Sequence, residues 1–491
     1  MKNSLKINPA DHVAVAIVPL KKGTVTEGVT LLDDIDAGHK FALKNISEHS
    51  DIIKYGSAIG RSTQAIAAGA WVHTHNLKTN LHDNLEYTYE PNGKPLQSFD
   101  SGMTFDGYLR KNGDAGIRNE LWIVPTVGCV NGQAQLIVDR VKKELDCSHL
   151  DDVRVWSHLY GCSQLGEDHE NTQKALVAVT KHPNAAGVLV LGLGCENNQM
   201  EDFVKALGNY DTARIKTLIA QDVEDEIAVG FDLMKELWQH SKTDQRQPLP
   251  MSKLKIGLKC GGSDGFSGIT ANPLTGLFSD WLIAQGGSTI LTEVPEMFGA
   301  ETILMNRCVD KNIFEKTVHL INDFKDYFRK HDQPIYENPS PGNKKGGIST
   351  LEDKSLGCTQ KGGNAQVVDV LGYTEPIKIH GLNLLHSPGN DLIAASALGF
   401  SGCQMVLFTT GRGTPFGSFV PTMKISSNSK LYHFKNNWID FNAGTILENE
   451  TMTECLNRFV KFLLEICSGK HLKHEDAGFK EIAIFKTGVT L

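Results

Sequence analysis

The sequence has no hydrophobic run long enough to cross a membrane and no long run of like charge. Its longest apolar stretch, near residues 185–194, is about half of the roughly 20 residues that a membrane helix needs. The start of the chain is basic, but Asp11 and His12 interrupt it, so it does not predict a signal peptide. The formal charge of −8 is spread along 491 residues. We therefore expect neither a membrane nor a nucleic acid as a partner.

The ten cysteines lack the dense spacing of a small disulfide-rich protein, and no C-x-x-C motif occurs. This favours reduced thiols and a cytoplasmic protein. Cys129, Cys162 and Cys195 each follow a glycine and are spaced by 33 residues, which suits one strand-and-helix unit. Cysteines also stand in other Gly-rich turns, at Cys260, Cys358 and Cys403. These thiols either hold an iron–sulfur cluster or are small buried residues, and the sequence leaves both interpretations open.

Two nucleotide-binding motifs are missing or incomplete. The chain has no G-x-x-x-x-G-K-[ST] sequence, and Asn197 stands where a G-x-G-x-x-G motif in residues 192–197 requires its third glycine. Residues 261–265 match G-x-S-x-G after an expected strand, but no acid and histidine can be assigned as partners of Ser263. Nucleotide binding and serine hydrolase chemistry are therefore disfavoured. A turn whose backbone N–H groups bind a carboxylate or hydroxyls is the better interpretation.

The texture of the sequence changes along the chain, which is long enough for two to four domains. Residues 11–76 hold short strand-like pieces separated by glycines and predict a small β module. Residues 87–105 have the composition of a linker. Beyond them, apolar strands alternate with Gly-rich turns and helical patterns, which predicts an α/β region with a largely parallel sheet. Such sheets bind ligands beyond the carboxyl ends of their strands.

Histidines near the end of the β module are candidate metal ligands. If WVHTHN, residues 71–76, is a strand, His73 and His75 point to one face and could bind one ion. His82 and Asp83 follow closely and could complete a site of two histidines and a carboxylate. Histidines that simply face solvent at a strand end are the alternative.

Two further features suit an anionic ligand. His39 and Lys40 give the β module hydrogen-bonding and cationic groups. The polar run of residues 336–363, which includes Lys354, is too long for a casual connection. It is either a loop that closes over an anion or a solvated surface loop.

Taken together, several motifs resemble the altronate dehydratase family very closely, and the galactarate dehydratases more distantly. They extend from residue 11 to the C-terminus and include GHKFAL, VHTHN, YGCSQLG, GLGCENNQ, CGGSDGFSGITANP and TTGRGTPFGSFVPTMKI. The resemblance implies a hydro-lyase that converts D-altronate to 2-dehydro-3-deoxy-D-gluconate and water in galacturonate breakdown. It also implies dependence on Fe2+ (or Mn2+), which favours a mononuclear site over a cluster.

The resemblance also implies an architecture. We expect an α/β protein with a small N-terminal β-clip module of the SAF type over residues 1–86 and a linker over 87–105. A large α/β catalytic region with Rossmann-like parallel sheet elements would follow over 106–491, divided into as many as two subdomains. A homodimer is the default expectation for such an enzyme.

The expected chemistry is removal of the poorly acidic C2 proton, helped by a divalent cation on the carboxylate and 2-hydroxyl, and loss of the 3-hydroxyl. We assign the metal to His73, His75 and a carboxylate, with Glu196 taken as the ligand and Asp264 and Asp353 as alternatives. Catalytic roles are assigned to His39, Lys354 and Asp264. Either His39 or Lys354 would be the base, a lysine needing a pKa lowered by the cation. Substrate binding is assigned to Lys40, Arg118, Ser263 and Arg412.

Two other functions remain as alternatives at this point. One is an iron–sulfur dehydratase, or a galactarate-type dehydratase, acting on a similar sugar acid. The other is a carbohydrate-binding protein without turnover. The role assignments are hypotheses, because the sequence does not say which turns converge in space.

Overall fold

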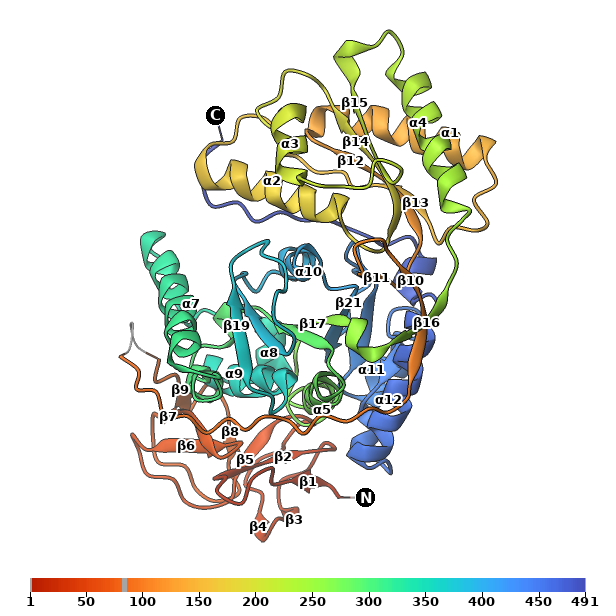
Figure 1. Ribbon diagram of the computed structural model, residues 1–491. Coiled ribbons are helices and arrows are strands. Elements are labelled where there is room, and N and C mark those ends of the chain that lie inside the picture. Colours follow the sequence, from red (N-terminus) through yellow and green to blue (C-terminus); the bar gives the residue numbers. More distant parts are fainter. Residues whose placement is uncertain (1, 82–85, 491) are drawn as a thin grey trace.

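The computed structural model describes residues 2–81 and 86–490. Figure 1 shows three units stacked one above another: a β module, a middle unit built on a large sheet, and a second α/β unit. None of the described helices combines the length and apolar character needed to cross a membrane. His82 and Asp83, which the sequence suggested as metal ligands, lie outside the described residues.

The N-terminal β module consists of short antiparallel strands. Its two main sheets have the strand orders β1-β2-β5-β8 and β6-β7-β9, and β3 pairs with β4. The strands are β1 (Ser4–Leu5), β2 (Val13–Ala16), β3 (Val25–Thr26), β4 (Val29–Thr30), β5 (Lys40–Ala42), β6 (Asp51–Lys54), β7 (Ser57–Ser62), β8 (Trp71–Val72) and β9 (Leu77–Lys78). Both faces of β2 and β5 are buried, since Ala300 and Leu356 of the middle unit join the module's apolar core. The predicted small β module is thus docked on the rest of the chain.

The second unit is a doubly wound parallel sheet with the strand order β13-β12-β14-β15. Its strands are β12 (Glu120–Pro125), β13 (Val153–Val155), β14 (Ala185–Gly192) and β15 (Ile215–Ile219). Helices α1 (Asn131–Glu144) and α4 (Glu226–Ser241) pack on one face, and α2 (Gly166–Thr180) and α3 (Met200–Leu207) on the other. Every residue of β14 is buried, as expected for a central strand covered on both faces.

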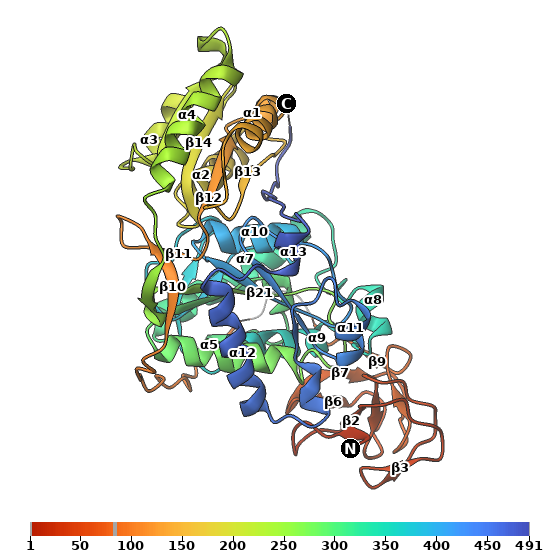
Figure 2. The ribbon, with the colours of Figure 1, turned by 90° about the vertical axis from the view of Figure 1, so that its right-hand side faces the viewer.

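Seven parallel strands, counted within residues 86–490, form the large sheet in the order β19-β20-β18-β17-β21-β22-β23. They are β17 (Lys255–Cys260), β18 (Ser288–Leu291), β19 (Val367–Leu371), β20 (Leu382–Leu385), β21 (Met405–Thr410), β22 (Thr422–Ser426) and β23 (Phe441–Asn442). Figure 2 shows α5 (Ala271–Ala284) and α12 (Met452–Cys467) crossing on one side of this sheet. Helix α10 (Asp391–Phe400) packs on β17 from the opposite side, where Gly257 leaves room for Leu398.

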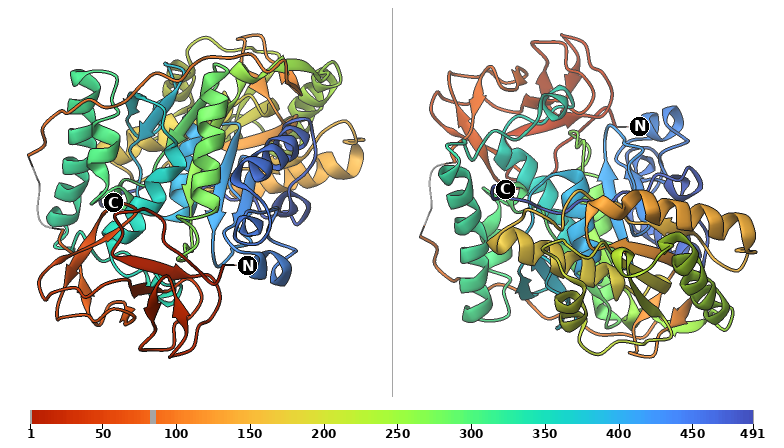
Figure 3. Two further views of the ribbon diagram at one scale, coloured as in Figure 1. Left: turned by 90° about the horizontal axis from the view of Figure 1, so that it is seen from below. Right: turned by 90° about the horizontal axis from the view of Figure 1, so that it is seen from above.

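Several segments connect the three units. The chain from 86 to 103 has no regular element and runs over the middle unit to β10 (Thr104–Leu109), as Figure 3 shows. Strand β10 pairs with β11 (Ala115–Gly116) and β16 (Gln247–Pro250), where the chain enters and leaves the second unit. The C-terminal tail returns to the second unit, because Asp168 accepts hydrogen bonds from the N–H groups of Thr487 and Gly488 at 2.8 and 2.6 Å.

The remaining helices surround the middle unit. They are α6 (Glu301–Met305), α7 (Lys311–Lys330), α8 (Pro341–Lys345), α9 (Leu351–Cys358), α11 (Ser429–Phe434) and α13 (Lys473–Asp476), with short 3-10 turns such as η4 (Val294–Glu296) and η5 (Thr359–Gly362).

Two local expectations were wrong. Only Trp71 and Val72 of WVHTHN are in a strand, because the chain turns over residues 73–76 to enter β9. Residues 336–363 are not an open loop. They contain α8 and α9, and all eight residues of α9 are buried between the β module and the large sheet.

Candidate active site at the edge of the large sheet

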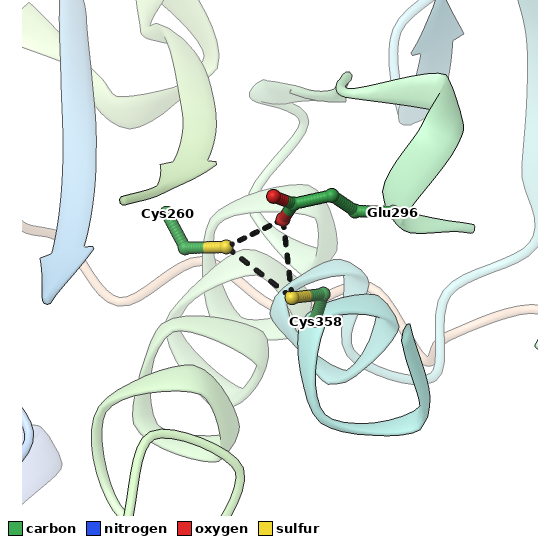
Figure 4. A group of neighbouring side chains, drawn as sticks. All are labelled: Cys260, Glu296 and Cys358. Carbon is green, nitrogen blue, oxygen red and sulfur yellow. Dashed lines mark hydrogen bonds between the residues drawn. The ribbon is translucent and has the colours of Figure 1, made fainter. Parts of the chain in front are cut away.

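Two thiols and a carboxylate meet beyond the carboxyl ends of the large-sheet strands. Cys260 is the last residue of β17, Glu296 ends the 3-10 turn after β18, and Cys358 ends α9 (Figure 4). Both Sγ atoms lie near Glu296 Oε2, at 2.9 Å for Cys260 and 3.2 Å for Cys358, and the two sulfurs are 3.3 Å apart. All three side chains are buried. We call them the thiol–carboxylate group.

Three buried lysines neutralise the carboxylates around this group. Lys354 Nζ donates to Glu296 at 2.6 Å. Lys259 lies 2.6 Å from Glu293, which also accepts from Lys361 at 3.2 Å. Burial alone would lower the pKa of Lys354, but the Glu296 carboxylate raises it above its usual range. Lys354 is therefore protonated at neutral pH.

The same contacts set the charge of the acids and thiols. Burial would raise the pKa of Glu296, but Lys354 and then Lys361 hold it well below its usual range. The hydrogen bond with Cys260, together with burial, raises the pKa of the Cys358 thiol. The carboxylate is thus ionised while the Cys358 thiol keeps its proton until something positive replaces it.

The residues present fit a divalent metal ion. In the part of the chain that the structure describes, one set of three His, Cys, Asp or Glu side chains has all its ligand atoms within 4.8 Å of one another. It consists of Cys260, Glu296 and Cys358. With both thiols ionised, the three side chains of the thiol–carboxylate group, Glu293 and Asp391 carry five negative charges. The ammonium groups of Lys259, Lys354 and Lys361 carry three positive charges. The difference of two equals the charge of a divalent cation.

The β module contributes two lysines to its contact with α9, and one of them, Lys54, lines an adjoining cavity. Lys40 of β5 and Lys54 of β6 each lie 2.9 Å from the buried carboxylate of Asp353 on α9. Lys40 also donates to the Gly347 carbonyl and to Ser349. Burial lowers the pKa of Lys40 to about 8, which its pairing with Asp353 only partly opposes. A charged triad therefore anchors the module to α9.

The Gly261–Gly265 turn borders the same pocket. Asp264 accepts hydrogen bonds from Ser267 at 2.9 Å and Ser427 at 2.8 Å, and burial raises its pKa. Ser263 is buried, yet its Oγ has no hydrogen-bond partner among the described residues. Lys54, Ser263, Asp264, Lys354 and Cys358 line one small enclosed cavity. The unpartnered hydroxyl therefore marks a place where a polar ligand atom fits.

Arg412 lies beside the Gly261–Gly265 turn. It is exposed and follows β21, and its Cβ is 3.4 Å from the position that a Cβ on Gly262 would occupy. No ion pair of its side chain occurs within the described parts of the chain. It is thus available to an anionic group entering from solvent.

The histidines of the β module lie against α8 and Trp71 and are not brought together as metal ligands. His73 Nε2 is 2.9 Å from the Lys344 carbonyl oxygen and its Nδ1 is 3.0 Å from Thr74 Oγ1, so both ring nitrogens are occupied. Burial lowers the pKa of His73 to about 4. The exposed His75 packs instead on Trp71, with ring centroids 4.9 Å apart.

His39 stacks on His73, with ring centroids 5.2 Å apart. Its Nε2 lies 3.2 Å from the Lys345 carbonyl oxygen, and its Nδ1 accepts from Trp71 Nε1 at 3.3 Å. Burial lowers the pKa of His39, so the ring is neutral at neutral pH.

Two expected site residues lie elsewhere. Arg118 is fully buried, and its guanidinium forms hydrogen bonds of 2.8 and 2.7 Å to the carboxylate of Glu475. Its other donors bind the carbonyls of Ile117, Ile466 and Lys470, which leaves it no free donor for a substrate. Glu196 belongs to the second unit, at the far end of the molecule from β8 in Figures 1 and 2. Its carboxylate accepts from Thr126 Oγ1 at 2.6 Å and from the Gly194 N–H at 2.6 Å.

Sequence reasoning missed Glu296 and Lys259 and did not assign a site role to Lys54 or Lys361, although Lys361 lies in the polar run of residues 336–363. Glu296 lies in TEVPEMFGAE, residues 292–301, where no local pattern marks it as a site residue. Cys260 and Cys358 were noted as thiols in Gly-rich turns, but nothing local indicates that they meet.

A β module that closes over the strand ends of an α/β sheet, with buried acid, ammonium and thiol groups between them, defines an enzyme active site suited to a hydroxy acid and a metal ion. Family models match nearly the whole chain. They are described as the altronate/galactarate dehydratase SAF domain (residues 2–80), the D-galactarate dehydratase/altronate hydrolase second domain (107–242) and the D-galactarate/altronate dehydratase C-terminal domain (251–490).

Similar proteins agree with these models. The chain is 56% identical to an altronate dehydratase of Bacillus subtilis, with all of both chains covered, and 54% identical to one of Escherichia coli, with 99% of each covered. It is 32% identical to an Escherichia coli galactarate dehydratase (L-threo-forming), over 96% of this chain and 94% of that protein. The protein belongs to the altronate/galactarate dehydratase family. The predicted SAF module, the α/β architecture and the hydro-lyase class are thereby confirmed.

Proposed function

We propose that the protein dehydrates D-altronate to 2-dehydro-3-deoxy-D-gluconate in the cytoplasmic breakdown of galacturonate. The observation that carries this proposal is the identity of more than half to two full-length altronate dehydratases, against about a third to the galactarate enzyme. The chemistry of the cavity supports it, because an unpartnered hydroxyl and an ammonium proton donor line the cavity.

The division of acid and base follows from the environments of two groups. Lys354 holds its proton through Glu296 and lies within the cavity, so it suits protonation of the leaving 3-hydroxyl. Neutral His39 suits abstraction of the C2 proton. Its Nε2–H donates to the Lys345 carbonyl, so its lone pair is on Nδ1, which must exchange the Trp71 N–H for the substrate. Arg412 and the Gly261–Gly265 turn are placed to bind the carboxylate and hydroxyl groups.

We propose Fe2+ (or Mn2+) as the cofactor and the thiol–carboxylate group as the residues that hold it. Thiolate and carboxylate ligands are both compatible with these ions. When bound, the ion supplies positive charge that stabilises the enediolate formed when the C2 proton leaves. The assignment to His73, His75 and Glu196 is the competing proposal. Two observations weigh against it: His73 Nε2 contacts the Lys344 carbonyl, and Glu196 lies in the second unit, where it binds Thr126.

The test is anaerobic turnover of D-altronate by metal-stripped protein, with Fe2+, Mn2+, Mg2+ or nothing added back, following 2-keto acid formation. We expect Fe2+ or Mn2+ to restore activity. Cys260→Ser should lower bound metal and activity at least tenfold, whereas Cys308→Ser, at a buried thiol elsewhere, should change neither. Metal content that survives Cys260→Ser but falls in His73→Gln would return the site to the histidines. Faster turnover of galactarate than of altronate would contradict the proposed substrate.

A further inference from the structure

The second unit carries three thiols at one edge of its parallel sheet, and the proposed reaction uses none of them. Cys129, Cys162 and Cys195 are exposed, whereas the other cysteines are buried or half-buried. Free cysteine is among the most buried residue types, so this exposure is unusual. All three stand in the turns that follow adjacent strands, β12, β13 and β14.

Hydrogen bonds hold these three turns side by side. The Gly128 N–H donates to the Tyr160 carbonyl at 2.9 Å, which joins the turns after β12 and β13. The Asn198 N–H donates to the Gly161 carbonyl at 3.0 Å, and Ser163 N–H to Asn197 Oδ1 at 2.8 Å, which joins the turns after β13 and β14. The side chain of Asn198 also donates to the Thr126 carbonyl at 3.1 Å, so each of the three turns contacts the other two and the Gly-Cys pairs form a triangle.

The glycine before each cysteine explains why the turns can approach so closely. A Cβ on Gly128 would lie 2.6 Å from the His158 carbonyl oxygen, and one on Gly161 would lie 2.1 Å from that of Thr126. Glu196 adds a further tie, because its carboxylate binds Thr126 Oγ1 on the neighbouring turn at 2.6 Å. The repeated Gly-Cys pairs therefore place three thiols on one rigid surface.

We infer that Cys129, Cys162 and Cys195 bind a [4Fe–4S] cluster. Their sulfurs do not all lie within 4.8 Å of one another, since the described residues hold just the thiol–carboxylate group at that spacing. A single ion needs closely grouped ligands, but in a cluster each thiolate binds a different iron, so a wider triangle fits. Three thiols lose their protons and form three Fe–S bonds without electron transfer, and the fourth iron is left for a small oxygen ligand.

The surroundings suit such a cluster. Helices α1, α2 and α3 all begin at this edge, so the positive ends of their dipoles face the anionic thiolates. Leu159 and Leu165, 90% and 54% exposed, flank Cys162 and would cover the cluster with apolar surface. The cluster would be assembled from two ferrous ions, two ferric ions and four sulfides, so that its formation needs no further oxidant or reductant.

The test uses the full chain, purified without oxygen and reconstituted with iron and sulfide. We expect brown protein with about four irons and four sulfides per chain. The triple variant Cys129→Ser, Cys162→Ser, Cys195→Ser should lose at least nine-tenths of the bound iron and of the bound sulfide. Cys147→Ser, at a half-buried thiol of the same unit, should keep both. Iron without sulfide, or colour that depends on Cys260 instead, would overturn the inference.

A second measurement needs no variant. In the reconstituted wild-type protein, mass spectrometry should find the three cysteines protected from alkylation, and removal of the cluster by chelator and oxidant should expose them. Equal labelling before and after removal contradicts the inference. Neither readout requires altronate, so its failure is distinct from failure of the proposed function.

Discussion

The two parallel sheets place cysteines at the same kind of position but surround them differently. At the edge of the large sheet, Cys260 is buried against Cys358 of α9, and a carboxylate and lysines neutralise one another around it. At the edge of the smaller sheet, Cys129, Cys162 and Cys195 are left uncovered. The strand-and-turn pattern thus supplies the thiols, and the covering element decides whether they become part of a buried charged site.

The largest expected effect is the loss of Lys354, whose Nζ donates to Glu296 of the thiol–carboxylate group. In Lys354→Met we expect kcat for the dehydration to fall about 10³-fold to 10⁴-fold, because the proton donor and its charge are both removed. Lys344→Met, at a half-buried lysine of α8, should retain kcat within about threefold. Steady-state kinetics of both purified variants check this. Equal loss in both would show that α8 and α9 merely support the fold.

The next largest effect concerns the contact between the β module and α9. Asp353→Asn leaves Lys40 and Lys54 buried without their shared carboxylate. We expect the free energy of unfolding to fall by about 3–5 kcal/mol, as for other broken buried ion pairs. Denaturant unfolding measures this, and Asp222→Asn at an exposed position should change it by less than about 0.5 kcal/mol. A small loss in Asp353→Asn would mean that the module is held by its apolar core alone.

The same contrast explains what could be predicted from the sequence. The alternation of strands with Gly-rich turns is local, so the α/β fold and the small β module were recognisable. The active site depends on partners far apart in the chain: Cys260 and Cys358 are separated by 98 residues, and Lys40 and Asp353 by 313. The strand on which the assignment of His73 and His75 relied is replaced by a turn at these residues. The buried partner of Arg118, Glu475, is 357 residues away and could not be inferred from the local sequence.

A smaller effect separates the buried histidine from the exposed one through pH. His73 has a folded-state pKa of about 4, below its unfolded value near 6.5, so the unfolded chain binds more protons between these values. Stability is therefore complete above pH 6.5 and is lost as the pH falls toward 4, by about 3 kcal/mol from this group. Urea unfolding at pH 7.5 and 4.5 should show most of this loss in the wild type and in His75→Gln. His73→Gln should lose about 2.5 kcal/mol less over that interval.

The smallest effect compares one thiol from each sheet edge in metal-free protein. Cys358→Ala removes a buried sulfur that packs between Cys260 and Glu296, so we expect a loss of about 1–2 kcal/mol in the free energy of unfolding. Cys162→Ala removes an exposed sulfur that accepts a long hydrogen bond from Ser163 Oγ at 3.9 Å. The free energy of unfolding should therefore change by no more than about 0.5 kcal/mol. A residue kept exposed without stabilising the fold is retained for what it binds. If Cys162→Ala were as costly as Cys358→Ala, the exposed thiols would be structural, and the difference between the two edges would reduce to packing.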